Sequence, residues 1–210
     1  MRLSAVYARF FRSLNFDFVK KSSLGYKPKP WDRIGEAQIN YPFVKVALDP
    51  GITTIVGANE SGKSQVLAAI EAAIGGEGII QKDFCRYSPF FLKSPSLTLP
   101  EFGLGFTGIE DKDVALLRSA CGPKVSSNVP DEVLLFRMNA TPKHRVYLRY
   151  GDEWAVHNVT KPSSLNGIGI PSVIKIDAKI PLPDSVSIKY IASGKISDAL
   201  PHGASTREAR

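Results

Sequence analysis

The stretch Thr53–Gly76, TTIVGANESGKSQVLAAIEAAIGG, combines a short apolar run, a glycine-bounded loop and an apolar stripe at helical spacing. Just ahead of the loop, the run Ile52–Val56 is compact and β-branched, which predicts a buried strand. Residues 57–64 then match the pattern G-x-x-x-x-G-K-[ST] without a gap. Strand, loop and helix in this order are the context in which such a loop holds phosphate groups. A chance match is the alternative, and the flanking elements argue against it.

The segment after the loop predicts an amphipathic helix, because its apolar residues recur at helical spacing. We expect one face to carry Val66, Leu67, Ile70, Ala73 and Ile74. Gly75 and Gly76 follow, and glycine readily takes the left-handed conformation that ends a helix. The helix is therefore expected to end there.

Each position of the loop has a predicted role toward a bound nucleotide. Gly57 and Gly62 allow backbone angles that a Cβ atom would resist. Lys63 is placed to reach the β- and γ-phosphates and is the predicted catalytic residue, while the Ser64 hydroxyl is placed to ligate Mg²⁺. Backbone N–H groups at the helix N-terminus converge on phosphate oxygens. The predicted ATP-binding residues of the loop are Gly57, Ala58, Asn59, Glu60, Ser61, Gly62, Lys63, Ser64 and Gln65.

Composition sets broad limits on the protein. Its 210 residues suit one large domain or two small ones, and 43% hydrophobic residues can build a core. No apolar run is long enough to span a bilayer, so we expect no membrane partner. The net charge of +7 is compatible with a polyanion such as DNA, although the basic residues are scattered. Cys85 and Cys121 show no metal-binding spacing, and a reducing cytoplasm is the simplest location.

The N-terminus, MRLSAVYARFFRSL, has three arginines and no acid before Asp17, as a transit peptide would. Alternation favours a first strand instead. The two alternating sets are Leu3, Ala5, Tyr7 and Arg9, and Ser4, Val6 and Ala8.

Further elements follow from periodicity and turn residues. Lys20–Gln38 is polar and predicts an exposed loop, and Phe43–Leu48 predicts a second strand. Ser96–Thr107 predicts another strand. Asp111–Cys121 predicts a short helix, with one face formed by Val114, Leu117 and Ala120.

The segment Asp131–Val159 predicts a β-meander. Its strands are Val133–Met138, Arg145–Tyr150 and Trp154–Val159, with turns at Thr141–Lys143 and Gly151-Asp152, and Lys161–Ile170 follows as a linker. The predicted fold class is α/β: a P-loop NTPase with a mixed sheet around the P-loop helix and an antiparallel β layer.

Efficient hydrolysis also needs an acid at a strand end. After the P-loop, Val173–Asp177 is the only apolar run that ends in Asp, and Lys175 inside it fits a buried strand poorly. Two roles therefore remain open for Asp177: an acid on the metal side of the site, or a surface-facing acid at the end of a strand. No Asn-Lys-x-Asp motif selects guanine, and no Ser-Gly-Gly signature is present.

Four stretches resemble the ABC-type ATPase heads, which include the SMC proteins, RecF and especially the OLD (overcoming lysogenization defect) nucleases and their AAA-type relatives. They are VYARFFRSLNF (6–16), DPGITTIVGANESGKSQVLAAI (49–70), DFCRYSP (83–89) and IPSVIKIDAKIPLPDSVSI (170–188). The resemblance covers most of the chain in order, and its specific elements are the P-loop and Phe-Arg-Ser. The last stretch is similar to the run that closes the family's N-terminal lobe, which argues against Asp177 as the acid.

The resemblance implies an ABC-ATPase-head-like lobe over residues 1–192. Residues 193–210 are then a polar tail or the start of a C-terminal region. In these families the signature motif and the Walker B strand follow a helical insertion, and this sequence shows neither motif. We therefore expect an incomplete head that does not hydrolyse ATP efficiently by itself.

The resemblance also implies roles for three residues outside the loop. Arg12 would lie near the bound nucleotide, with an ordinary surface arginine as the alternative. Asp83, in preference to Gln81, would contact Mg²⁺ or water, and plain loop polarity is the alternative.

The implied function is ATP binding and hydrolysis with Mg²⁺ in DNA maintenance or anti-phage defence. ATP would drive homo-oligomerisation through the heads and control a nuclease or other effector subunit, and DNA is a further candidate partner. Two alternatives stay open. One is a self-contained small kinase that uses Asp177 and lid arginines, for which the candidates are Arg137, Arg145 and Arg149. The other is a non-catalytic nucleotide-sensing module.

Overall fold

The computed structural model describes residues 1–15, 27–34, 39–76, 79–88, 99–138 and 141–174. The chain divides into two units, Met1–Pro171 and Ser172–Arg210, and the fold described here is that of the first unit. The predicted segment Ser185–Ile191 and the candidate acid Asp177 lie outside the described residues.

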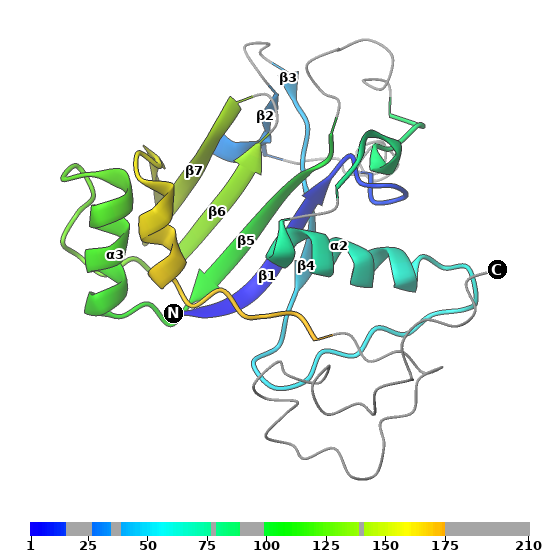
Figure 1. Ribbon diagram of the computed structural model, residues 1–210, viewed down its shortest axis with the longest axis horizontal. Coiled ribbons are helices and arrows are strands. Elements are labelled where there is room, and N and C mark those ends of the chain that lie inside the picture. The colour runs from blue at the N-terminus through cyan, green and yellow to red at the C-terminus, as the bar shows by residue number, and fades with distance from the viewer. Residues whose placement is uncertain (16–26, 35–38, 77–78, 89–98, 139–140, 175–210) are drawn as a thin grey trace, which may run out of the picture. The chain divides into compact units, whose positions relative to one another are not determined.

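Six strands form one antiparallel sheet in the order β4-β1-β5-β6-β7-β8 (Figure 1). Their bounds are β1 Arg2–Arg9, β4 Val44–Ala47, β5 Glu101–Thr107, β6 Glu132–Met138, β7 Thr141–Tyr150 and β8 Glu153–Asn158. Val6 of β1 lies opposite Val46 on one side and Leu104 on the other. A separate two-stranded ribbon pairs β2 (Arg33–Ile34) with β3 (Ile39–Asn40).

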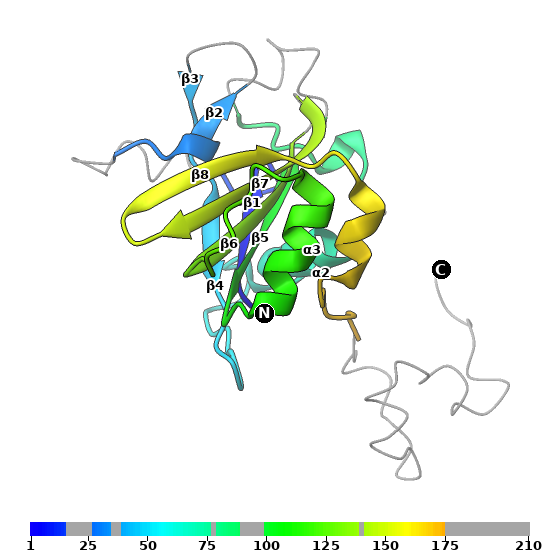
Figure 2. The same cartoon turned by 90° about the vertical axis from the view of Figure 1, so that its left-hand side faces the viewer.

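The α-helices cover one face of the sheet. Helix α2 (Lys63–Gly75) packs against β1 and β5, and α3 (Asp111–Cys121) packs against the 3-10 helix Pro162–Gly167. Figure 2 shows both α-helices on one side of the sheet and the β2–β3 ribbon on the other. In the described part of the chain, no helix is long and apolar enough to cross a bilayer.

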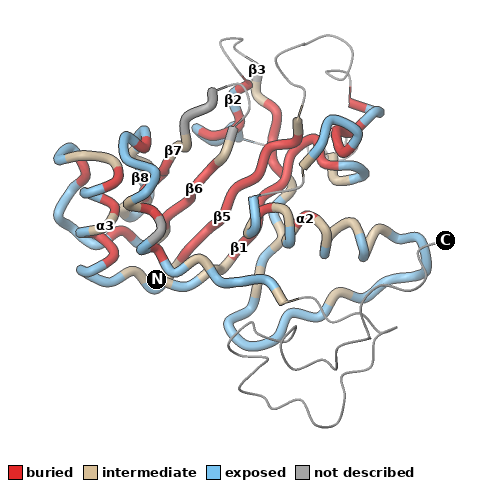
Figure 3. The backbone as a smooth tube through the Cα atoms, viewed as in Figure 1, coloured by how far each residue is buried: buried red, intermediate tan, exposed pale blue. Residues whose placement is uncertain are grey.

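Two hydrophobic clusters lie on the two faces of the sheet. On the helix side, Val6 and Ala8 of β1 join Ala69 and Ala73 of α2. On the opposite side, Tyr7 joins a mostly aromatic group, which we call the aromatic cluster. Its members are Ala5, Tyr7, Trp31, Phe43, Leu134, Phe136 and Tyr147, with Trp154 packed against it. Successive strand residues point to opposite faces, so β1 contributes to both clusters and is buried along most of its length (Figure 3).

The buried Arg9 links β1 to β5 and to the residues around Asp32 and Tyr41. Arg9, at the end of β1, forms an ion pair with Glu101 of β5. Its Nη1 donates to the carbonyl oxygens of Asp32, at 3.0 Å, and Tyr41, at 2.7 Å. The guanidinium also lies over the Phe43 ring, 4.1 Å from its centroid. Arg9 therefore anchors Asp32, Tyr41 and Phe43 to the sheet.

Several predicted elements are confirmed. The N-terminal strand is β1, the second strand is β4, and α3 has the predicted bounds with Val114, Leu117 and Ala120 buried. Helix α2 ends at Gly75, and Gly76 is its left-handed cap, donating its N–H to the Ala72 carbonyl. The meander is present as β6, β7 and β8.

The largest correction concerns the strand predicted at Ile52–Val56. These residues form no strand, and the side chains of Ile52 and Val56 are 86% and 84% exposed. A strand is stabilised by a neighbouring strand, and this segment pairs with none of the described strands. The prediction of a mixed sheet is also wrong, because every pairing between the described strands is antiparallel.

Three smaller predictions also differ from the structure. Leu67 is 57% exposed, because α2 buries the narrower strip of Ala69 and Ala73 against the sheet. The turn predicted at Thr141–Lys143 is instead the start of β7. The predicted linker Lys161–Ile170 contains a 3-10 helix that buries Leu165 and Ile168 in the helix-side cluster.

Candidate nucleotide site

The predicted P-loop forms a tight backbone turn at the start of α2. Gly62 is the N-cap of the helix and has a φ of 93°, in the left-handed region that suits glycine. Its carbonyl oxygen accepts from the N–H groups of Gln65, at 2.9 Å, and Val66, at 3.1 Å. Glu60 also has a positive φ, of 62°. The loop therefore enters the helix through two left-handed residues.

The Ser61 side chain lies close to the backbone at Gly57. A Cβ atom at this position would lie 2.5 Å from the Ser61 hydroxyl oxygen, so a larger residue requires the Ser61 side chain to move.

Lys63 bridges the two ends of the loop. Its ammonium group donates to the carbonyl oxygen of Gly57, at 2.7 Å, and to that of Ala58. The lysine follows Gly62 in the chain, so its side chain folds back from the end of the loop to the beginning. A cation is therefore held where the predicted nucleotide phosphates would lie.

Several donors around the lysine have no protein acceptor among the residues that the structure describes. They are the backbone N–H groups of Asn59, Glu60, Gly62, Lys63 and Ser64. The Ser64 side chain is exposed at the first turn of α2. Unpaired N–H groups at a helix N-terminus, next to an ammonium group, are suited to an anion. The chemistry of this loop thus fits a phosphate group.

The Phe-Arg-Ser element forms a strained corner beside the P-loop. Phe10 and Arg12 have φ values of 60° and 49°, which side-chain-bearing residues seldom adopt. Two backbone hydrogen bonds hold the corner, from the Arg12 N–H to the Asp83 carbonyl and from the Cys85 N–H to the Phe10 carbonyl, each at 2.7 Å. Ser13 Oγ lies 3.9 Å from the position that a Cβ atom on Gly62 would occupy. The corner therefore abuts the loop.

The corner also brings Arg12 and Asp83 together. Arg12 Nε donates to Asp83 Oδ1 at 3.0 Å, and Asp83 Oδ2 accepts from the Ile80 N–H at 3.2 Å. The two side chains line a cavity of about 220 Å³ against α2, together with Glu71. Gln81 is exposed in the 3-10 helix Gln81–Asp83. This ion pair was not predicted, because nothing in the local sequence links residues that lie so far apart.

The residues present are compatible with a nucleotide-bound Mg²⁺. Mg²⁺ at such sites takes most of its ligands from phosphate oxygens and water, and few from the protein. Accordingly, the described residues contain no group of three or more His, Cys, Asp or Glu side chains that could hold a metal. Ser64 would supply the hydroxyl ligand. The metal role of Asp83 stays a prediction.

Comparison with known proteins agrees with the interpretation of this loop as a P-loop. Residues 34–114 match the family model of an AAA domain, a segment that contains the P-loop, α2 and the Arg12 partner Asp83. Neither the curated proteins nor the solved structures yield a match to the chain. Taken with the loop geometry, the family match supports a generic P-loop ATPase.

Proposed function

We propose that this chain supplies the nucleotide-binding lobe of an ATPase that resembles the OLD, RecF and SMC heads. ATP binding at residues 57–65 would drive two heads together and control a nuclease or another effector. The observation that carries the proposal is the Lys63 ammonium held across the loop, beside unpaired N–H groups at the start of α2.

Each residue of the site has a distinct part in this proposal. The Lys63 ammonium exchanges its carbonyl partners for the β- and γ-phosphate oxygens, and the N–H groups of the loop donate to the same phosphates. Mg²⁺, when bound with the nucleotide, neutralises phosphate charge, and the Ser64 hydroxyl holds it in place. Arg12, 43% exposed next to Asp83, remains available to turn toward the nucleotide.

Exposed apolar residues support the idea that the site is completed by further structure. Ile52, Val56 and Leu67 flank the P-loop, and all three are mostly exposed. The backbone N–H and C=O groups of residues 52–56 have no strand beside them in the described part of the chain. We propose that additional strands of the complete ATPase pair with this segment. DNA maintenance or anti-phage defence and a cytoplasmic location are part of the same proposal.

The kinase alternative receives less support. Two of its candidate lid arginines have partners within the domain: Arg149 pairs with Glu132 at 3.2 Å, and the Arg137 guanidinium packs close to Gly76 at the end of α2. Its acid, Asp177, lies outside the described residues.

Calorimetry with ATP and Mg²⁺ tests the nucleotide site. Lys63→Ala removes the side-chain charge held at the loop, and we expect ATP affinity to fall at least tenfold, about 1.4 kcal/mol or more. Lys124→Ala, which changes the same charge at an exposed position after α3, serves as the matched control and should leave affinity unchanged. Equal ATP binding by Lys63→Ala and the parent would refute the P-loop assignment.

A further inference from the structure

A larger cavity lies on the sheet face that carries no α-helix. Its volume is about 470 Å³, and it opens among β1, β4, β6, the β7–β8 turn and the 3-10 helix Pro30–Asp32. Tyr7 of β1 lines this cavity, whereas its neighbours Val6 and Ala8 belong to the cluster that packs on α2. The sheet therefore separates this aromatic cavity from the helix that carries the P-loop.

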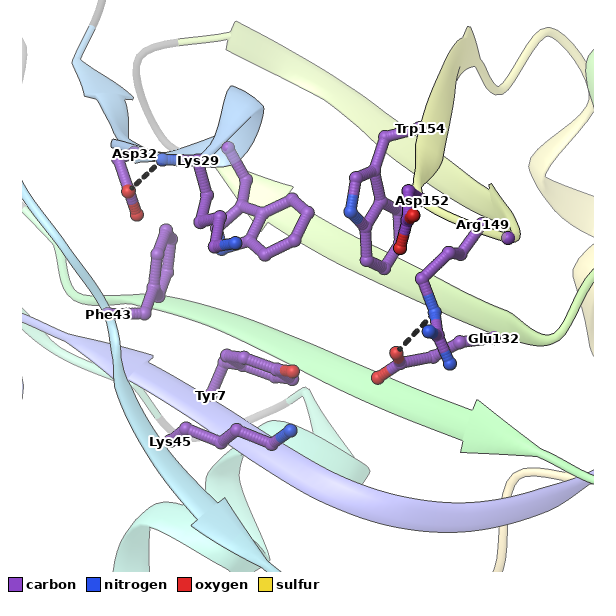
Figure 4. Close-up of a pocket in the computed structure, with 11 residues that line it drawn as sticks. Tyr7, Lys29, Asp32, Phe43, Lys45, Glu132, Arg149, Asp152 and Trp154 are labelled. Atoms are coloured by element: carbon purple, nitrogen blue, oxygen red, sulfur yellow. Dashed lines mark hydrogen bonds and ion pairs between the residues drawn. The ribbon is translucent and has the colours of Figure 1, made fainter. Parts of the chain in front are cut away.

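Two tryptophans form a fixed corner in the aromatic cavity. The ring centroids of Trp31 and Trp154 are 4.7 Å apart and their planes meet at 79°. Trp31 is held from behind by Phe136, at 5.9 Å with nearly parallel rings, and by the edge contact with Tyr147. Figure 4 shows the Trp154 indole above the Tyr7 ring. Rigid aromatic surfaces of this kind suit a planar ligand, because stacking requires little loss of side-chain freedom.

The aromatic cavity is rich in hydrogen-bond donors. The Tyr7 hydroxyl and the indole N–H groups of Trp31 and Trp154 have no acceptor among the described residues. Burial, and then the nearby charge of Glu132, raises the pKa of Tyr7 far above its usual value. Tyr7 therefore remains protonated and can donate.

Two lysines add positive charge at the rim. Lys29 and Lys45 are exposed, and neither forms an ion pair within the described part of the chain. The Lys45 ammonium lies 5.7 Å from the centroid of the Tyr7 ring. Arg149 is neutralised by Glu132 at 3.2 Å. The carboxylates of Asp32 and Asp152 also line the cavity, so the lysines would match the anionic group of a ligand that carries hydrogen-bond donors as well.

We propose that the aromatic cavity binds a nucleotide unit, with the base against Trp154 and Tyr7 and the phosphate at Lys29 and Lys45. The exposed Asp152 carboxylate, also in the lining, accepts from a base amino group or a sugar hydroxyl. Stacking on aromatic rings beside basic groups is how single-stranded nucleic acids are commonly held. The same unit also exists as a free mononucleotide. This second site is independent of the proposed ATPase site.

The test uses the full chain with Lys63→Ala, which is expected to weaken binding at the P-loop at least tenfold. A failure of the proposed ATPase therefore leaves the readout of the aromatic cavity intact. Fluorescence anisotropy follows a labelled oligothymidylate at low salt, and calorimetry follows AMP. Lys45→Ala and Trp154→Ala should each weaken binding about tenfold, and added salt should weaken it further. Trp154→Phe should retain most of the affinity, and Lys124→Ala should match the parent.

The two probes distinguish the sources of the nucleotide. If AMP binds and displaces the oligothymidylate, the site accepts a free mononucleotide; if the oligothymidylate alone binds, the site takes single-stranded nucleic acid. Lys45 is exposed, so its variant remains informative even where Trp154→Ala fails to fold. Absence of binding by both probes, or binding that Lys45→Ala leaves within twofold of the parent, would overturn the proposal.

Discussion

We expect the Mg²⁺ dependence of nucleotide affinity to act through Ser64. Its hydroxyl is exposed in the first turn of α2, next to the lysine that folds over the loop. Ser64→Ala keeps the backbone donors and removes the metal ligand, so nucleotide affinity should become nearly insensitive to Mg²⁺. Calorimetric titrations of ATP with and without Mg²⁺ measure this directly.

Ser61→Ala is the matched control, because it removes a hydroxyl from the same loop at a position that is not predicted to ligate the metal. It should keep the full Mg²⁺ effect. If Ser64→Ala also keeps that effect, other groups hold the metal.

Two histidines of the meander are expected to reduce stability in acid. Burial lowers the pKa of both His144 and His157 below the usual 6.5, and the charge of Arg137 adds to the shift at His144. As the pH falls below about 6.5, the unfolded chain takes up protons that the folded chain does not, so the free energy of unfolding decreases. Urea denaturation followed by circular dichroism at pH 7.5, 6.5 and 5.5 should show lower midpoints toward acid. The double variant His144→Gln/His157→Gln should flatten this trend, and an equal decline in both proteins would contradict the assignment.

Strand β5 meets β6 through a glycine that has no room for a side chain. Gly103 lies opposite Phe136, and a Cβ atom on Gly103 would lie 2.4 Å from two carbons of the Phe136 ring. Gly103→Ala should therefore destabilise the protein by about 1–3 kcal/mol, measured by urea unfolding.

A control for this substitution is Gly169→Ala, since nothing lies within 4 Å of a Cβ atom there, and its effect should stay within about 0.5 kcal/mol. Trimming the ring should relieve the clash, so Gly103→Ala should cost less in a Phe136→Leu background. Equal costs in the two backgrounds would show that the contact does not limit stability.

Elements with a strong local signal were predictable from the sequence. Helix α3 combines apolar residues at helical spacing with an acid at its start, and the Asp113 carboxylate accepts from the Glu110 N–H at 2.9 Å. Ile52–Val56 has equally strong β propensity, yet it forms no strand, because strand formation depends on a partner that the segment itself does not contain.

The candidate site shows the same division between local and long-range information. The P-loop motif and the helix after it are contiguous in sequence, so the position of the loop before α2 and the end of α2 could be predicted. The Arg12–Asp83 ion pair and the aromatic cavity are assembled from distant segments. No spacing rule connects Tyr7, Trp31 and Trp154: two of them lie on strands of the sheet, and the 3-10 helix Pro30–Asp32 brings Trp31 against them.

Considered as a whole, the chain should bind ATP and turn it over slowly. The loop supplies contacts to the phosphates of the bound substrate. Of the acids considered for the reaction, Asp83 is paired with Arg12, and Asp177 lies outside the described residues. Binding that is equally strong in the ground and transition states does not accelerate the chemical step. Steady-state phosphate release should therefore be far below the roughly 1–10³ s⁻¹ of ordinary enzymes.

Lys63→Ala provides the blank for this measurement, and addition of the proposed completing lobe or partner should raise turnover. Rapid, Lys63-dependent phosphate release by the monomeric chain of 210 residues would refute the incomplete-head proposal. It would also make Asp177 the leading candidate for the catalytic acid.

The position of β1 between β4 and β5 has a consequence for folding order. The meander β6–β8 joins neighbours in sequence, so its hairpins can close quickly. Strand β1 instead pairs with β5 across a separation of about a hundred residues, from Arg2–Thr107 to Arg9–Glu101. During synthesis, β1 thus leaves the ribosome well before β5 and gains its second neighbour late. Until β5 emerges, the aliphatic and aromatic side chains of β1 remain accessible to chaperones and to other unfinished chains.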